Sequence, residues 1–251
     1  MVNSIWADLW KVDAAAGVYN SGSSGTITST LNQTLYFKDT LVDAESEYKG
    51  YFYISLKHPL AIVPNVRFEY MALALKGDSI EVGARSTFFT KGVSVRSDLV
   101  SSSLGMTQYD SILFYSLIDG DAGITFDLGL DVKYLISDYE ISSIAVSSKE
   151  SSIIPLLYLR GRFDTPLTGF GVEGDVKYIT DGSSTVYDVR IKVDYTMTFV
   201  PVLHPGVELG YRIQQFTSYG DESALIGPIL SSDTDSDIYF GGFYAGASVK
   251  F

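Results

Sequence analysis

The chain has 251 residues, of which 46% are hydrophobic, and its formal net charge at pH 7 is −12. This acidity argues against a nucleic-acid partner, because binding to phosphates needs concentrated Lys and Arg. The absence of cysteine excludes disulfides, thiolate metal sites and cysteine nucleophiles. No stretch approaches the roughly 18 consecutive apolar residues of a spanning helix, and the abundance of Tyr, Phe, Gly and β-branched residues favours β structure.

Ten segments alternate between apolar and polar residues, the pattern of a β-strand with one face of each kind. In 185–199, for example, Val189 and Ile191 alternate with Arg190 and Lys192. Several of these segments exceed the roughly 5–6 residues of a typical strand in a soluble protein and suit an oblique membrane crossing. The predicted strands are 7–19, 47–58, 65–76, 106–118, 123–137, 153–164, 169–180, 185–199, 206–218 and 238–251.

The connections between these strands alternate between short and long, apart from the short turn at 180–183. This alternation is typical of bacterial outer-membrane barrels, which have short periplasmic turns and longer outer loops. We therefore predict one all-β domain over 1–251, a transmembrane antiparallel up-and-down barrel of about ten strands with both termini in the periplasm. The long extracellular loops are expected near 20–46, 77–105, 138–152 and 219–237.

The ends of the strands support this prediction. Apolar faces end in aromatic residues such as Tyr134, Tyr178 and Tyr187, and aromatic residues concentrate at the two membrane–water boundaries of such barrels. The last strand resembles the C-terminal insertion signal of outer-membrane barrels. This resemblance implies the barrel-assembly machinery as a partner, and the residues that carry it are Tyr244, Gly246, Val249 and Phe251.

The whole chain also resembles a family of proteobacterial outer-membrane β-barrel proteins with no assigned activity. The resemblance rests on turn and strand motifs at 53–59, 63–65, 108–110, 155–158, 162–169 and 206–212. It implies the fold and a place in the outer membrane of a Gram-negative cell, among lipid and lipopolysaccharide. It transfers no catalytic residue. No signal peptide precedes Ile5, so we expect a precursor from which one was cleaved.

If the apolar faces meet lipid, the other faces line the lumen with charges of both signs. Barrels of eight strands are filled by their own side chains, and ten strands lie near that limit. Two interpretations stay open: a plugged barrel with a structural or surface-interaction role, or a narrow channel or carrier for small, even hydrophobic, solutes. The predicted lumen-lining residues are Asp127, Asp131, Lys133, Arg160, Arg162, Glu173, Asp175, Lys177, Asp188, Arg190, Lys192, Asp194, Glu208 and Arg212.

Catalytic chemistry has little support, so we expect no enzyme, no cofactor and no metal. An outer-leaflet hydrolase is the least favoured alternative, because its usual base would be histidine and both histidines, His58 and His204, precede proline in predicted periplasmic turns. An acidic run at 233–237 is a solvated loop or a Ca²⁺ site that lacks the Gly and Glu of an EF-hand. Two apolar loop segments, 31–42 and 224–230, either pack on each other or contact lipopolysaccharide or a solute.

Overall fold

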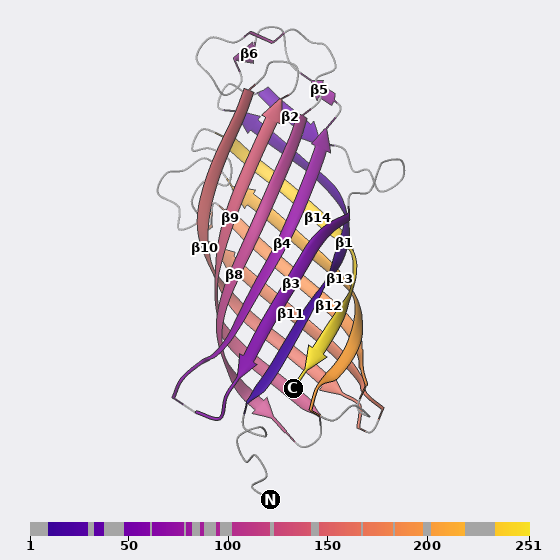
Figure 1. The fold of residues 1–251 in the computed structure, drawn as a ribbon. Coiled ribbons are helices and arrows are strands. Elements are labelled where there is room, and N and C mark those ends of the chain that lie inside the picture. Colours follow the sequence, from indigo (N-terminus) through magenta and orange to yellow (C-terminus); the bar gives the residue numbers. More distant parts are fainter. Residues whose placement is uncertain are drawn as a thin grey trace, which may run out of the picture.

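The protein is a closed β-barrel (Figure 1). The computed structural model describes residues 10–29, 33–37, 48–60, 62–77, 79–81, 86–87, 94–95, 102–120, 123–141, 146–166, 168–182, 184–197, 202–218 and 234–251. Within these ranges no helix is long and apolar enough to cross a membrane.

Ten long strands make the wall in the described part of the chain, and each pairs antiparallel with its neighbours. They are β1 (Lys11–Ser29), β3 (Tyr48–Lys57), β4 (Asn65–Gly77), β8 (Ser102–Asp119), β9 (Ile124–Ile141), β10 (Val146–Asp164), β11 (Phe170–Thr180), β12 (Thr185–Thr196), β13 (His204–Ser218) and β14 (Thr234–Lys250). The predicted fold class, an antiparallel barrel of about ten strands, is confirmed.

Four short strands lie at the end of the barrel away from the C-terminus (Figure 1). There β2 (Gln33–Phe37) pairs with the upper part of β1, and β5 (Ser79–Glu81) pairs with β2. The other two, β6 (Ser86–Thr87) and β7 (Ser94–Val95), pair only with each other. The strands β2 and β5 therefore extend the barrel sheet beyond the ten long strands, whereas β6 and β7 form a separate two-stranded sheet.

The barrel closes because β14 pairs with β1 along nearly its whole length. The seam begins at the last residue, where Val12 N–H donates to the Phe251 carbonyl at 2.6 Å and Phe251 N–H returns a bond of 3.0 Å. Following paired residues once around the barrel from Val12 leads back to β1 at Ser24, twelve residues further along. For ten strands, this stagger corresponds to a strand tilt of about 40°.

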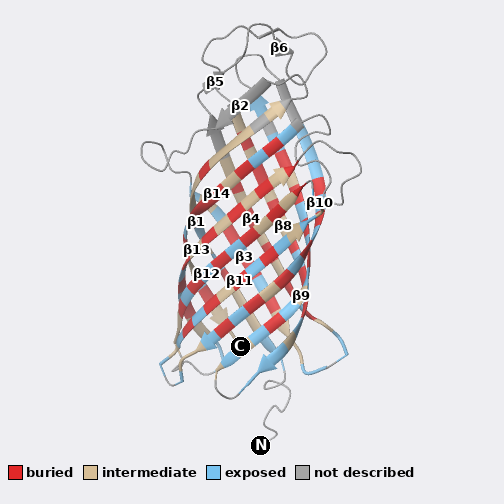
Figure 2. Ribbon diagram, turned by 180° about the vertical axis from the view of Figure 1, so that it is seen from behind, coloured by how far each residue is buried: buried red, intermediate tan, exposed pale blue. Residues whose placement is uncertain are grey.

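The two faces of the wall differ sharply in burial (Figure 2). On β12, Val189, Ile191 and Val193 are 37%, 57% and 49% exposed, whereas Arg190 and Lys192 between them are buried. The apolar side chains therefore point outward and the charged ones inward, the reverse of a soluble sandwich.

The outer apolar band has the height of a membrane. On β9 it runs from Ile124 to Tyr134, and beyond it the outer positions become polar at Asp138 and Glu140. At about 3.3 Å per residue and a tilt of about 40°, the stretch from Ile124 to Tyr134 rises about 25 Å along the barrel axis. This matches the apolar band of outer-membrane barrels, about 25 Å tall.

The strands are longer than the sequence pattern predicted at the end away from the C-terminus. The predicted loop 138–152 is wrong: β9 continues to Ile141, β10 begins at Val146, and only 142–145 lie outside the two strands. The predicted loops 20–46, 77–105 and 219–237 likewise lose residues to β1, β8 and β14. The reason is compositional, since these strand ends are rich in Ser and Thr, which hid their alternation.

Candidate functional site: the interior of the barrel

The structure places all fourteen predicted lumen-lining residues in the interior, each 8% exposed or less. They come from β9 to β13, and the inner positions of β4 and β8 add Arg67, Glu69 and Asp110. A buried charge without a partner would cost much free energy. The ion-pair and hydrogen-bond partners of each charged side chain therefore show whether the interior is a stable, filled core.

The centre of the interior holds a cluster in which cations and carboxylates alternate. Lys133 donates to Asp110 at 2.8 Å and lies 3.3 Å from Asp188. Lys177 donates to Glu69 at 2.8 Å and also to Asp110. These contacts join β4, β8, β9, β11 and β12, which are not all neighbours, so the cluster spans the lumen.

Arginines extend this cluster toward β13 and β11. Arg212 holds Asp188 with both its Nε, at 2.8 Å, and its Nη2, at 2.5 Å. Arg190 binds Asp175 at 2.7 Å and reaches Glu69 at 3.2 Å. Arginine suits these positions because its planar fork matches a carboxylate with two parallel hydrogen bonds.

A second cluster lies closer to the C-terminal end of the barrel. Arg160 bridges Asp127 and Glu173, each at 2.6 Å. Arg162 holds both oxygens of Asp194, at 2.7 and 3.0 Å, and contacts Glu173 at 3.2 Å. Most of the carboxylate oxygens here are occupied by buried cations, so this level of the barrel is a connected ion-pair network.

Glu208 is bound by two tyrosines of β3 that reach it from the opposite side of the seam. Tyr51 and Tyr53 donate to its two oxygens at 2.8 and 2.9 Å, and Lys192 donates to it at 2.9 Å. Tyr51 crosses the seam over glycines, since it lies opposite Gly17, which in turn lies opposite Gly246. A Cβ at Gly246 would collide with the Tyr51 hydroxyl.

Asp131 is the exception in the network. It is fully buried, and among the described residues neither of its oxygens accepts a hydrogen bond. Its one ion pair within the described residues, with Lys177, spans 3.7 Å. The ammonium of Lys177 is directed instead to Glu69 and Asp110, which leaves Asp131 at the edge of the cluster.

Above the charged clusters, on the side away from the C-terminus, the interior turns apolar. On β9 the inner residues run from Asp131 and Lys133 to Leu135, and on β4 from Glu69 to Met71 and Leu73. The side chains of this apolar layer pack into one buried cluster. They are Met71, Leu73, Leu104, Met106, Leu135, Ile154, Leu156, Val186, Phe216, Ile238 and Phe240.

Two glutamines mark the boundary between the two environments. The amide nitrogen of Gln214 donates to Gln108 at 2.8 Å, and it also donates to Asp188 of the charged cluster at 2.8 Å. Lys133 in turn donates to Gln108 at 3.1 Å. The charged residues predicted to line the lumen therefore lie below this pair of glutamines, and the sequence pattern did not reveal the apolar layer above it.

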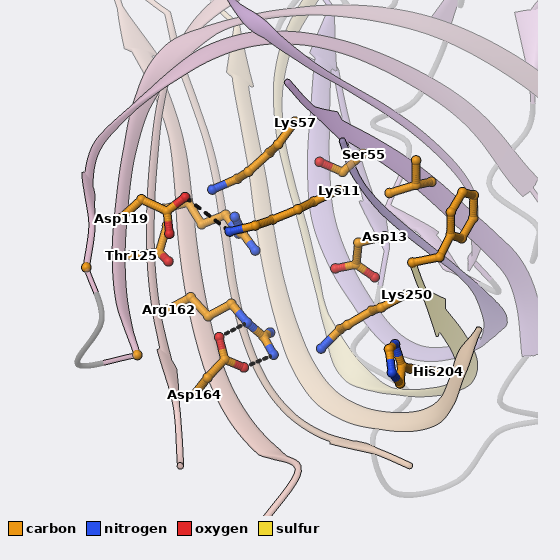
Figure 3. A pocket seen from close by; sticks show the side chains of 15 residues that line it. Lys11, Asp13, Ser55, Lys57, Asp119, Thr125, Arg162, Asp164, His204 and Lys250 are labelled. Carbon is orange, nitrogen blue, oxygen red and sulfur yellow. Dashed lines mark hydrogen bonds and ion pairs between the residues drawn. The ribbon is translucent and has the colours of Figure 1, made fainter. Parts of the chain in front are cut away.

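The histidines lie at the C-terminal end of the barrel, where the sequence placed them. His58 stabilises its own turn: Nδ1 accepts from Leu60 N–H at 3.2 Å and Nε2 bonds the Pro64 carbonyl at 3.0 Å. His204 opens β13 opposite Lys250 and lines a cavity there (Figure 3). No group of three or more metal-ligating side chains occurs in the described part of the chain.

The four residues of the predicted insertion signal divide between the two faces of β14. Tyr244 is buried in the interior and Gly246 lies beneath Tyr51, whereas Val249 and Phe251 have the parity of the outer face. Of the acidic run, Asp235 and Asp237 lie on β14, while residue 233 falls outside the described residues. Of the apolar segment 31–42, residues 33–37 form β2, and residues 31–32 and 38–42 fall outside the described residues, as does the segment 224–230.

Comparison with known proteins bears on the fold. No family model and no curated protein matches the chain. Among solved structures, the outer membrane protease OmpT from Escherichia coli matches with a TM-score of 0.52 at 10% identity, covering 96% of this chain and 97% of that one. The fold is that of an outer-membrane β-barrel. The toluene transporter TodX of P. putida and an anion-selective porin from Comamonas acidovorans match with TM-scores of only 0.28 and 0.18.

Proposed function

We propose that this protein is an integral outer-membrane barrel with a plugged interior, which serves a structural or surface-interaction role. The observation that carries the proposal is the two-level filling of the barrel: an ion-pair network below and a packed apolar layer above. An apolar layer offers no hydrogen bonds to water or to a passing ion, so it opposes permeation even where the charged level holds water.

The proposal includes the orientation and the compartment. At the end of the barrel that holds the C-terminus every connection between the long strands is short, whereas the three longest connections are at the other end, together with the short ones at 142–145 and 181–184. In outer-membrane barrels short turns face the periplasm and long loops face the exterior. We therefore assign both termini to the periplasm of a Gram-negative cell, with outer-membrane lipid and lipopolysaccharide around the apolar band and the barrel-assembly machinery as the insertion partner.

We further propose that the protein is not an enzyme. Its resemblance to OmpT is one of fold, and the histidines of this chain lie at the opposite end from the long loops, within a turn and at a strand start. Apart from Asp131, the carboxylates of the two interior clusters are held by buried arginines and lysines. Such ion pairs keep a carboxylate charged and occupied, which suits a structural role better than general acid or base chemistry.

Conductance in planar bilayers tests the plugged interior. The purified barrel is expected to insert without unitary current steps, while a water-filled porin reconstituted in parallel conducts. A variant with Phe216→Gly and Phe240→Gly, which thins the apolar layer, should raise the leak if that layer contributes to the seal. Reproducible unitary steps from the unmodified protein would refute the proposal and favour a narrow channel.

A further inference from the structure

A cavity of about 450 Å³ opens at the C-terminal end of the barrel, below the ion-pair network (Figure 3). Its lining is richer in cations than the chain as a whole. Five lysines and arginines line it against three aspartates, although the chain carries 18 Lys and Arg against 30 Asp and Glu. In an acidic protein, a lining with more cations than carboxylates favours the binding of an anion in this cavity.

Three of the cations come from the strands at the seam. Lys11 of β1 lies directly opposite Lys57 of β3, and Lys250 of β14 lies opposite both Asp13 and His204. Figure 3 shows the ammonium groups of Lys11, Lys57 and Lys250 inside the cavity. Like charges directly opposite each other on neighbouring strands are destabilising. Lys57 offsets part of this repulsion by donating to Asp127 at 3.1 Å and to Ser116 at 2.9 Å, which leaves one of the three donors of its ammonium group.

These cations keep hydrogen-bond donors to spare. Among the described residues Lys11 makes one ion pair, with Asp119 at 3.6 Å, which is beyond hydrogen-bond distance. Within the part of the chain that the structure describes, Lys250 donates only to Asp194, at 2.7 Å, and an ammonium has three donors. Arg160, which also lines the cavity, is buried, and within the described residues its Nε–H has no partner.

The aspartates of the lining do not consume these donors. Asp164 is held by Arg162 with bonds of 2.6 and 2.9 Å. Asp119 contacts Lys11 only at 3.6 Å, and one carboxylate oxygen of Asp13 has no hydrogen-bond partner among the described atoms. The carboxylates behind the cavity, such as Asp127, are already paired with buried arginine. Spare positive donors therefore face the open space.

We infer that this cavity binds an anionic group, a carboxylate or a phosphate, that enters from the C-terminal end of the barrel. Lys11, Lys57 and Lys250 contact the anion directly, and Arg160 supplies the buried donor behind it. The volume suits one such group on a small molecule or at the end of a polymer, since ligand pockets measure roughly 300–1,000 Å³. The site does not depend on whether the barrel conducts.

Calorimetric titration of the folded, full-length protein in detergent tests the inference at neutral pH. Inorganic phosphate and succinate are used as separate probes, so that the probe that binds shows whether the site prefers a phosphate or a carboxylate. Saturable binding is expected, and the double variant Lys11→Gln with Lys250→Gln should weaken it at least about tenfold, because two charge-assisted contacts are lost.

Lys149→Gln is the matched control, since Lys149 is exposed on β10 at the other end of the barrel. It should bind as the unmodified protein does. Heat-dependent migration on gels establishes that each variant is folded. Absence of saturable binding for both probes overturns the inference. So does binding that the double variant leaves unchanged, or that Lys149→Gln weakens equally.

Discussion

At the scale of single residues, Glu208 connects strands that the wall alone does not connect. Tyr51 and Tyr53 approach it from β3 and Lys192 from β12, so three side chains converge on one carboxylate of β13. Because the strands between β3 and β13 are β1 and β14, these hydrogen bonds fasten the interior across the seam. Their loss should therefore weaken closure as well as local packing.

Replacing Tyr51 or Tyr53 with Phe removes one hydrogen bond to a buried carboxylate, and the change at Tyr53 also removes the bond that its hydroxyl accepts from Lys192 at 2.6 Å. Each variant should lower the free energy of unfolding by about 1.5–3 kcal/mol, the usual contribution of a hydrogen bond to a charged group. Denaturant unfolding in detergent or lipid measures it. Tyr158→Phe is the control, because Tyr158 is equally buried and its hydroxyl has no partner among the described residues. A loss as large in the control would show that the hydrogen bonds are not the cause.

A glycine on β9 allows two rings to meet. Gly129 lies opposite Phe114 of β8 and Tyr158 of β10, whose rings pack edge-on over it at 6.1 Å between centroids. A methyl group at Gly129 would press on the Leu113 carbonyl and on Phe114, so Gly129→Ala should cost about 1–3 kcal/mol of stability. Gly161→Ala, where a Cβ meets nothing within 4 Å, should change stability by less than about 0.5 kcal/mol. Equal unfolding midpoints for the two variants would contradict this packing argument.

At the scale of strands, the sequence predicted most of the wall because one physical pattern repeats along it. Alternation of apolar and charged residues gave the position and inward face of β12, and the brief turns gave the antiparallel order. The pattern failed where both faces have the same character. On β10 the run from Ile153 to Leu157 is apolar at every position, so it does not tell which side chains belong to the interior layer.

The interior contacts were beyond the sequence for a different reason. Charges of both signs on the inner face predict ion pairs, but the partners are set by the stagger of the closed sheet. Glu208 and Tyr51 are far apart in the chain and meet because Gly17 and Gly246 lie between them in the same row. A glycine in an alternating strand was the one available signal, since it often marks a close approach of other groups.

The outward face of β9 gives a prediction for the strand as a membrane element. Leu130 is 64% exposed and lies midway along the apolar band, so Leu130→Lys should destabilise the folded barrel in lipid by about 2–4 kcal/mol. Ser151→Lys, on the exposed outer face of β10 beyond the band, should cost no more than about 1 kcal/mol. Unfolding in lipid vesicles compares them. Equal costs at the two positions would argue against a membrane around this band.

At the scale of the whole molecule, the ion pairs are unusual in being inside. Surface ion pairs weaken as salt screens them, whereas buried pairs are screened much less. Raising the salt concentration from about 0.05 M to about 1 M should therefore leave the unfolding midpoint nearly unchanged, although the network holds many charges. A steep loss of stability with salt would mean that solvent ions reach the interior.

The seam between Val12 and Phe251 also determines when in folding the barrel can close. The strand β1 is synthesised more than 200 residues before its partner β14, and contacts between such distant parts of a chain form slowly. Until then the backbone N–H and C=O groups along one edge of β1 are unpaired, and they can pair with a strand of another chain. Until β14 is available, protection of this unpaired edge against aggregation must come from something other than the fold of the chain itself.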